Sequence, residues 1–164
     1  LGYIFRMSGA IPVYRKQDQQ LGAKADNSVP LGEAMKVLQR NGCFGIFPEG
    51  TISTSFEIKG LRSGAVRLAI GAGVPVIPTI VWGGQRVYTK GVKPNFKRGK
   101  TPVTVSFGEV IHYSKDVDVE AAELHLRQVM TSMLHEVQEN YPDSHVGQRW
   151  APVCLGGTAP APLN

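Results

Sequence analysis

Short apolar runs alternate with amphipathic stretches along this chain, which predicts strands separated by helices. Four runs are typical of strands: Ile11–Tyr14, Cys43–Phe47, Gly73–Trp82 and Val103–Phe107. Apolar residues recur at helical spacing in four other stretches: Leu1–Ser8, Leu31–Leu38, Leu61–Gly71 and Val119–Asn140. The alternation predicts an α/β fold with a mostly parallel central sheet flanked by helices.

The run Cys43–Phe47 carries no charge and is too short for a typical helix, so it is predicted to be a buried strand. Pro48 cannot donate to a sheet ladder, and Gly50 permits a sharp reversal. Because ligands bind outside the carboxyl ends of parallel strands, Glu49 and Thr51 are expected at the lip of a crevice. A solvated strand-end turn is an equally good interpretation of these residue types.

The length of 164 residues and the apolar content of 42% fit one domain with a sizeable core. We predict a folded domain over residues 1–140 and a flexible tail, rich in Pro and Gly, over 141–164. The two cysteines do not make a disulfide framework, which is typical of a cytosolic chain. No stretch reaches the roughly 20 apolar residues that a transmembrane helix needs.

The chain is basic, with 18 Lys and Arg against 13 Asp and Glu. Six of the cations fall within fifteen residues: Arg86, Lys90, Lys93, Lys97, Arg98 and Lys100. This run indicates an anionic partner such as a lipid surface, or else a solvated basic loop. Nucleic acid is disfavoured, because aromatic residues are not interleaved with the charge. Lys59 and Gly60, at the expected start of the helix over 61–71, are candidates for holding a phosphate.

Four blocks stand in the order and spacing of a known family: Gly9–Arg15, Phe47–Thr51, Lys59–Gly60 and Val74–Pro78. The chain resembles the glycerolipid acyltransferases, whose best-known members are 1-acylglycerol-3-phosphate acyltransferases. Each block lies on the element that the hydrophobic pattern predicts for it, and together they cover residues 1 to about 112.

The resemblance implies transfer of a fatty acyl group from acyl-CoA or acyl carrier protein to lysophosphatidate, forming phosphatidate in phospholipid biosynthesis. Glycerol 3-phosphate or another lysolipid is an alternative acceptor. The implied partners are the lysophospholipid acceptor, the acyl thioester donor and an anionic membrane surface. Neither a metal nor a resident cofactor is expected, and the expected location is peripheral, on the cytoplasmic face of a membrane.

In this family a histidine, followed five residues later by an aspartate, takes the hydroxyl proton as the acceptor attacks the thioester. This chain lacks such a pair, because Asp116 and Asp118 follow His112 at four and six residues and no other histidine has an aspartate five residues later. We expect the pair upstream of Leu1, and we expect the 164 residues alone to be inactive.

The family's second block places its arginine at Arg15, an implied contact for the substrate phosphate. Its third block places Glu49, Gly50 and Thr51 around the glycerol-phosphate site. The family usually has an arginine after this threonine, where Ile52 stands here. We predict that Lys59 and Arg62 take the place of that cation.

Two other functions are weighed against the transferase. A hydrolase that used Glu49 as an acid would need a second carboxylate or a nucleophile, and the sequence offers no convincing partner. A non-catalytic module that binds anionic membranes would use the basic run but has no need for the ordered blocks.

Overall fold

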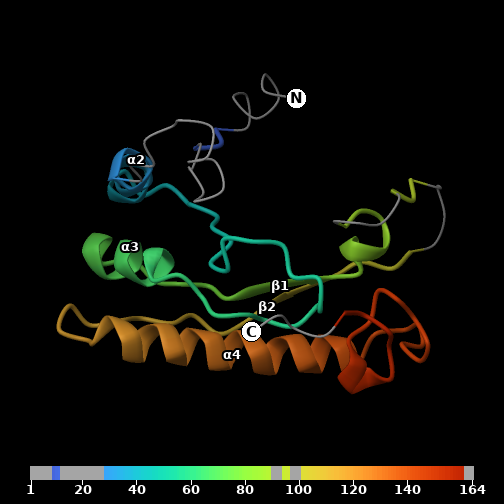
Figure 1. Cartoon of the computed structure of the whole chain (residues 1–164). Helices are drawn as coiled ribbons and strands as arrows, with labels where there is room; N and C mark the ends of the chain where they lie inside the picture. Colours follow the sequence, from blue (N-terminus) through green and yellow to red (C-terminus); the bar gives the residue numbers. More distant parts are fainter. Residues whose placement is uncertain (1–8, 12–27, 90–93, 97–100, 161–164) are drawn as a thin grey trace.

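The computed structural model describes residues 9–11, 28–89, 94–96 and 101–160. Its elements are α2 (Ser28–Gln39), α3 (Gly64–Ala72), β1 (Thr79–Trp82), η2 (Gly84–Arg86), β2 (Thr104–Phe107), α4 (Val119–Glu139) and η3 (Val153–Leu155). In Figure 1, α4 runs along one face of the β1–β2 sheet and beneath α3, and α2 lies on the side of α3 away from α4. The α/β class is therefore confirmed. The helix predicted over Leu1–Ser8 and the strand predicted over Ile11–Tyr14 lie outside the described residues, apart from Ile11.

The sheet corrects one part of the prediction, because β1 and β2 pair antiparallel and not parallel. Thr79 lies opposite Phe107, and Trp82 lies opposite Thr104. An isolated antiparallel bridge between Val76 and Ile111 continues the pairing beyond the prolines of the predicted strand. Gly83 ends β1 at φ 100°, where a Cβ would lie 2.2 Å from the carbonyl oxygen of Pro102, so only glycine fits.

The segment Cys43–Phe47 is not the buried strand that the sequence predicts. Its backbone has no ladder partner among the described residues, and 90% of the Phe47 surface is exposed. An extended segment becomes a strand only when a neighbouring strand accepts and donates its backbone hydrogen bonds. Absence of charge therefore identified an apolar segment correctly but did not determine its pairing or its burial.

The longest predicted helix, Val119–Asn140, is confirmed as α4 to within one residue. The Asp118 carboxylate caps it by accepting a hydrogen bond from the Ala121 N–H at 2.8 Å. The N-terminal half of α4 buries Ala122 and Leu126 against Leu61 and Val66. The C-terminal half buries a second set of side chains, which forms the cluster of Ile80, Trp82, Leu134, Val137 and Tyr141. Ile58 and Met130 contact both clusters, so α4 carries one continuous core.

The two shorter helices end where the sequence predicts. Asn41 adopts a left-handed φ of 59° after α2, and Gly73 does the same at 66° after α3. The start of α3 differs from the prediction, because the helix begins at Gly64 and not at Leu61. The Arg62 N–H donates to the Pro48 carbonyl at 2.7 Å, which holds this residue outside the helix.

In place of the flexible tail predicted over 141–164, residues 141–160 fold back through a series of hydrogen-bonded turns. Tyr141, Ala151 and Ala159 are buried. The Tyr141 hydroxyl donates to the Pro102 carbonyl at 2.6 Å, and it accepts a hydrogen bond from Arg86 at 2.9 Å. Small residues such as Ala151 and Gly157 permit neighbouring backbone segments to approach closely here. The prediction of a flexible tail rested only on the Pro and Gly content of this segment.

An aromatic cluster anchors this segment to the end of β1. His145 packs against Trp82, Tyr141 and Trp150 with ring centroids 5.3 to 6.2 Å apart. The Arg86 guanidinium forms an ion pair with Asp143 and lies 4.5 Å from the centroid of the Trp150 ring. Burial lowers the pKa of His145, and the positive charge of Arg86 lowers it further.

Acidification should destabilise the fold through His145. The pKa of His145 is lower in the folded chain than in the unfolded chain. The contribution of His145 to stability is therefore complete above the ordinary pKa of histidine and is lost as the pH falls below that pKa. We expect the unfolding midpoint to fall more between about pH 7 and about pH 5 in the natural chain than in His145→Gln. The chain's two tryptophans both adjoin His145, so their fluorescence follows the transition.

The control for this measurement is His135→Gln, which changes an exposed histidine on α4 and should keep the pH dependence of the natural chain. If His145→Gln and the natural chain showed the same pH dependence, the loss of stability on acidification would not come from His145.

Candidate functional site

The predicted site residues meet where the turn Pro48–Thr51 contacts the segment Lys59–Arg62. The Lys59 N–H donates to Glu49 Oε2 at 3.0 Å, and the Arg62 N–H donates to the Pro48 carbonyl at 2.7 Å. These two bonds hold the segments side by side although ten residues separate Glu49 from Lys59. Four of the predicted residues, namely Glu49, Gly50, Lys59 and Arg62, are therefore brought together.

Gly50 provides the backbone conformation of the turn beside Arg62. Its φ of 63° lies in the left-handed region, and a Cβ built at this position would lie 3.6 Å from Cγ of Arg62. The Gly50 N–H donates to the Phe47 carbonyl at 3.1 Å, which closes the turn. The Arg62 side chain thus lies against the turn that carries Glu49.

The other site residue predicted within the described part of the chain is Thr51. Thr51 is exposed in the turn, next to Gly50. Arg15 lies outside the described residues, as do Lys90, Lys93, Lys97, Arg98 and Lys100 of the basic run. The helix N-terminus predicted to follow Lys59 and Gly60 is displaced, because α3 begins only at Gly64. Its free N–H groups therefore do not adjoin Lys59 directly.

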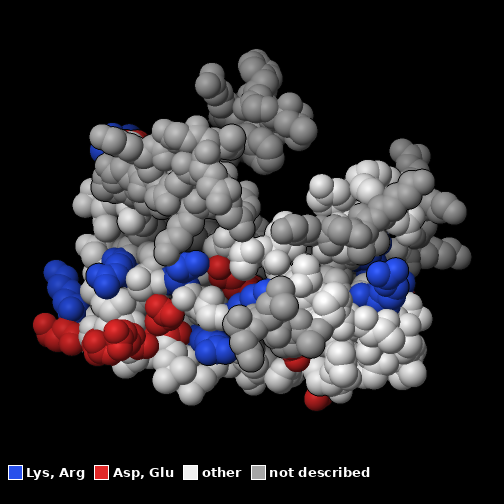
Figure 2. All heavy atoms as spheres, viewed as in Figure 1, with Lys and Arg blue, Asp and Glu red and all other residues white. Residues whose placement is uncertain are grey.

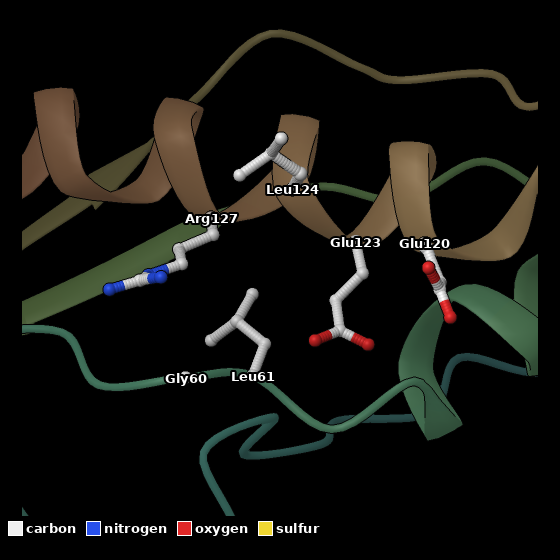
Figure 3. A pocket seen from close by; sticks show the side chains of 6 residues that line it. All are labelled: Gly60, Leu61, Glu120, Glu123, Leu124 and Arg127. Atoms are coloured by element: carbon white, nitrogen blue, oxygen red, sulfur yellow. The ribbon is translucent and has the colours of Figure 1, made fainter. Parts of the chain in front are cut away.

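A hollow of about 310 Å³ lies beside this segment, between it and α4. Figure 3 shows Leu61 directed into it, with the Arg127 side chain on one side and the Glu123 carboxylate on the other. Its lining consists of Gly60, Leu61, Glu120, Glu123, Leu124 and Arg127. Two carboxylates against one guanidinium repel a phosphate, so this hollow is a poor site for an anionic headgroup.

Among the described residues over α3 and the first half of α4, charge does not gather into one positive surface (Figure 2). Figure 2 shows acidic and basic side chains intermixed over the region of α3 and the first half of α4. Within the described residues, no group of three or more His, Cys, Asp or Glu is placed to hold a metal ion. In that same part of the chain, no helix is both long and apolar enough to span a bilayer.

A family model described as Acyltransferase matches residues 1–82, which is half of the chain. The chain belongs to the acyltransferase family. The match contains the whole Glu49–Lys59 site, together with α2, α3 and β1. The resemblance to glycerolipid acyltransferases is therefore confirmed at the level of the family. No curated protein matches the acyltransferase chain.

A solved structure supports the same relationship. The acyltransferase chain is similar to the crystal structure of the 1-acyl-sn-glycerophosphate (LPA) acyltransferase PlsC from Thermotoga maritima, with a TM-score of 0.57 and 26% sequence identity. The similarity covers 70% of the present chain and 46% of PlsC. The acyltransferase thus spans less than half the length of that structure.

The bond between Glu49 and Lys59 should contribute measurably to the stability of the acyltransferase. Glu49→Ala removes the acceptor of a partly buried N–H, so we expect the free energy of unfolding to fall by about 1 to 2 kcal/mol. Glu49→Gln keeps an oxygen at this position, and its loss should be about half as large. Chemical denaturation of the two variants provides the comparison.

Glu109→Ala is the matched control, because Glu109 is an exposed carboxylate outside the candidate site. If Glu49→Ala cost no more stability than Glu109→Ala, the bond would have no structural role.

Proposed function

We propose that this acyltransferase moves a fatty acyl group from acyl-CoA or acyl carrier protein to lysophosphatidate, forming phosphatidate. The observation that carries the proposal is the joining of Glu49 to the Lys59–Arg62 segment, within the residues that the family model matches. The likeness to a structure named as an LPA acyltransferase supports lysophosphatidate as the acceptor.

The charges at the site suit a phosphorylated alcohol. Lys59 and Arg62 supply two cations, and the planar guanidinium of Arg62 suits bidentate recognition of a phosphate. Glu49 is fixed by the Lys59 N–H and is a fitting acceptor for a hydroxyl group of the glycerol. The expected division of work is that the cations hold the phosphate while the carboxylate orients the glycerol.

The reaction breaks the C–S bond of the thioester and forms a C–O ester bond, and the acceptor hydroxyl loses its proton. A base must take that proton as attack occurs. Of the four histidines, His145 is enclosed by aromatic rings and His125 packs edge-on against Tyr113. None forms the pair with an aspartate five residues later that the family uses.

A lipid acceptor also implies a membrane partner. We propose that the acyltransferase binds peripherally to an anionic bilayer on the cytoplasmic side, with the basic run between β1 and β2 contributing up to about 1 kcal/mol per cation near the surface. A non-catalytic module would bind the same anionic surface but would not distinguish lysophosphatidate from other anionic lipids. Preference for lysophosphatidate therefore separates the transferase from this alternative.

Removal of either cation should weaken acceptor binding. In the full-length gene product, Lys59→Ala and Arg62→Ala should each raise KM for lysophosphatidate about tenfold, because each removes one charged contact to the phosphate. The Lys59 N–H remains in Lys59→Ala, so its bond to Glu49 is preserved. Steady-state kinetics with varied acceptor provide the measurement.

Lys36→Ala on α2 and Arg67→Ala on α3 are matched controls, because both side chains are exposed and lie outside the site. An unchanged KM in Lys59→Ala or Arg62→Ala would remove that residue from the acceptor site.

The 164-residue chain by itself should not catalyse the transfer, because its histidines do not supply the paired base. Incubation with lysophosphatidate and acyl-CoA, followed by separation of the lipids, should yield no phosphatidate above the uncatalysed level. Turnover above that level would contradict the proposal that the base lies outside this sequence.

A further inference from the structure

The site described above forms the neck of a closed loop. Glu49 and Lys59 join its two ends. Inside it, the Ser53 hydroxyl donates to the Glu57 carbonyl at 2.9 Å and accepts a hydrogen bond from the Ser55 hydroxyl at 3.1 Å. Ser55 is fully buried. These hydrogen bonds tie residues 49–59 into a compact unit.

One residue of the loop is strained. Phe56 has a φ of 59°, in the left-handed region that aromatic residues rarely adopt. Such a conformation is energetically costly, and it persists only where the surroundings compel it. The surroundings here include the cluster of Ile80, Trp82, Leu134, Val137 and Tyr141, against which the Phe56 side chain packs.

A buried side chain on α4 adds the decisive contact. Gln138 is only 1% exposed, and its Nε2 donates to the Phe56 carbonyl at 3.3 Å. A buried amide needs such a partner, because leaving the donor unsatisfied is costly. The helical pattern of α4 did not single out Gln138, since a glutamine followed by Glu139 and Asn140 is typical of a surface position. Gln138 also lies beyond residues 1–82, which the family model matches.

We propose that Gln138 is a positioning residue for the acceptor site. By holding the Phe56 carbonyl, it maintains the left-handed backbone at Phe56 and keeps the neck in the arrangement that presents Glu49, Lys59 and Arg62 together. The expected effect on binding of the acceptor rests on the proposed function. The attachment of the loop to α4 rests on the structure alone.

The test uses Gln138→Met, which keeps an unbranched side chain of similar length and removes the donor. Amide hydrogen exchange should become at least about tenfold faster across residues 49–59, including the Lys59 N–H, while α3 and the first half of α4 are unaffected. In the full-length gene product, KM for lysophosphatidate should rise about fivefold with kcat within about twofold of the natural value. Gln128→Met, an exposed glutamine on the same helix, should change neither quantity.

A measurement on the natural chain covers the case in which Gln138→Met does not fold. The side-chain amide protons of Gln138 should exchange slowly and show a nuclear Overhauser contact to Phe56, and absence of both signals would overturn the inference.

The outcomes separate this inference from the proposed function. Unchanged exchange over 49–59 in a folded Gln138→Met would overturn the attachment itself. Faster exchange with unchanged KM would overturn the positioning role and leave the proposed function intact. If the natural full-length protein did not use lysophosphatidate at all, the positioning role would fall together with the proposed function, even with faster exchange in the variant.

Discussion

The fold depends on the burial of one face of α4. This helix is the only described element that contacts β1, β2 and α3 alike, and both apolar clusters include its side chains. Each large apolar side chain that it buries contributes about 1.5 to 3 kcal/mol relative to exposure, before the entropy of ordering is considered. A two-stranded sheet is at best marginally stable in isolation, so β1 and β2 rely on α4 for their shape. The candidate site is held by the same packing, through Ile58 next to Lys59 and through Leu61 next to Arg62.

Local signals in the sequence determined the helix ends and the last strand. Asp118 is a cap because its short carboxylate reaches the N–H three residues later, and Asn41 ends a helix because asparagine tolerates a left-handed backbone. The alternation of residue types in Val103–Phe107 identified β2 as a strand, although its apolar residues are the exposed ones and Thr104 and Ser106 are half-buried. The ordered blocks pointed to Glu49 and Lys59, and nearness in sequence pointed to Arg62. The structure brings these three residues together, while their role in binding stays a prediction.

The features that escaped prediction are non-local. The start of α3 moved because Arg62 bonds to Pro48, fourteen residues earlier in the chain. The packing of residues 141–160 depends on Arg86 and Pro102, which no local pattern connects with Tyr141. Cys43–Phe47 has the composition of a buried strand, but burial requires a partner that composition does not specify. Composition likewise does not specify burial in the sheet, because the apolar residues Val81, Val105 and Phe107 are exposed on its outward face.

The contact between Gln138 and Phe56 has a consequence for how the family's sequence relates to its folding unit. The residues that the family model matches stop at Trp82, which is the last residue of β1. The partner strand of β1, and the helix that covers both strands, come later in the chain. A polypeptide ended at Trp82 would keep every recognisable block yet lose most of the apolar surface on which those blocks rest. The boundary by which the family is recognised is thus not a boundary of autonomous folding.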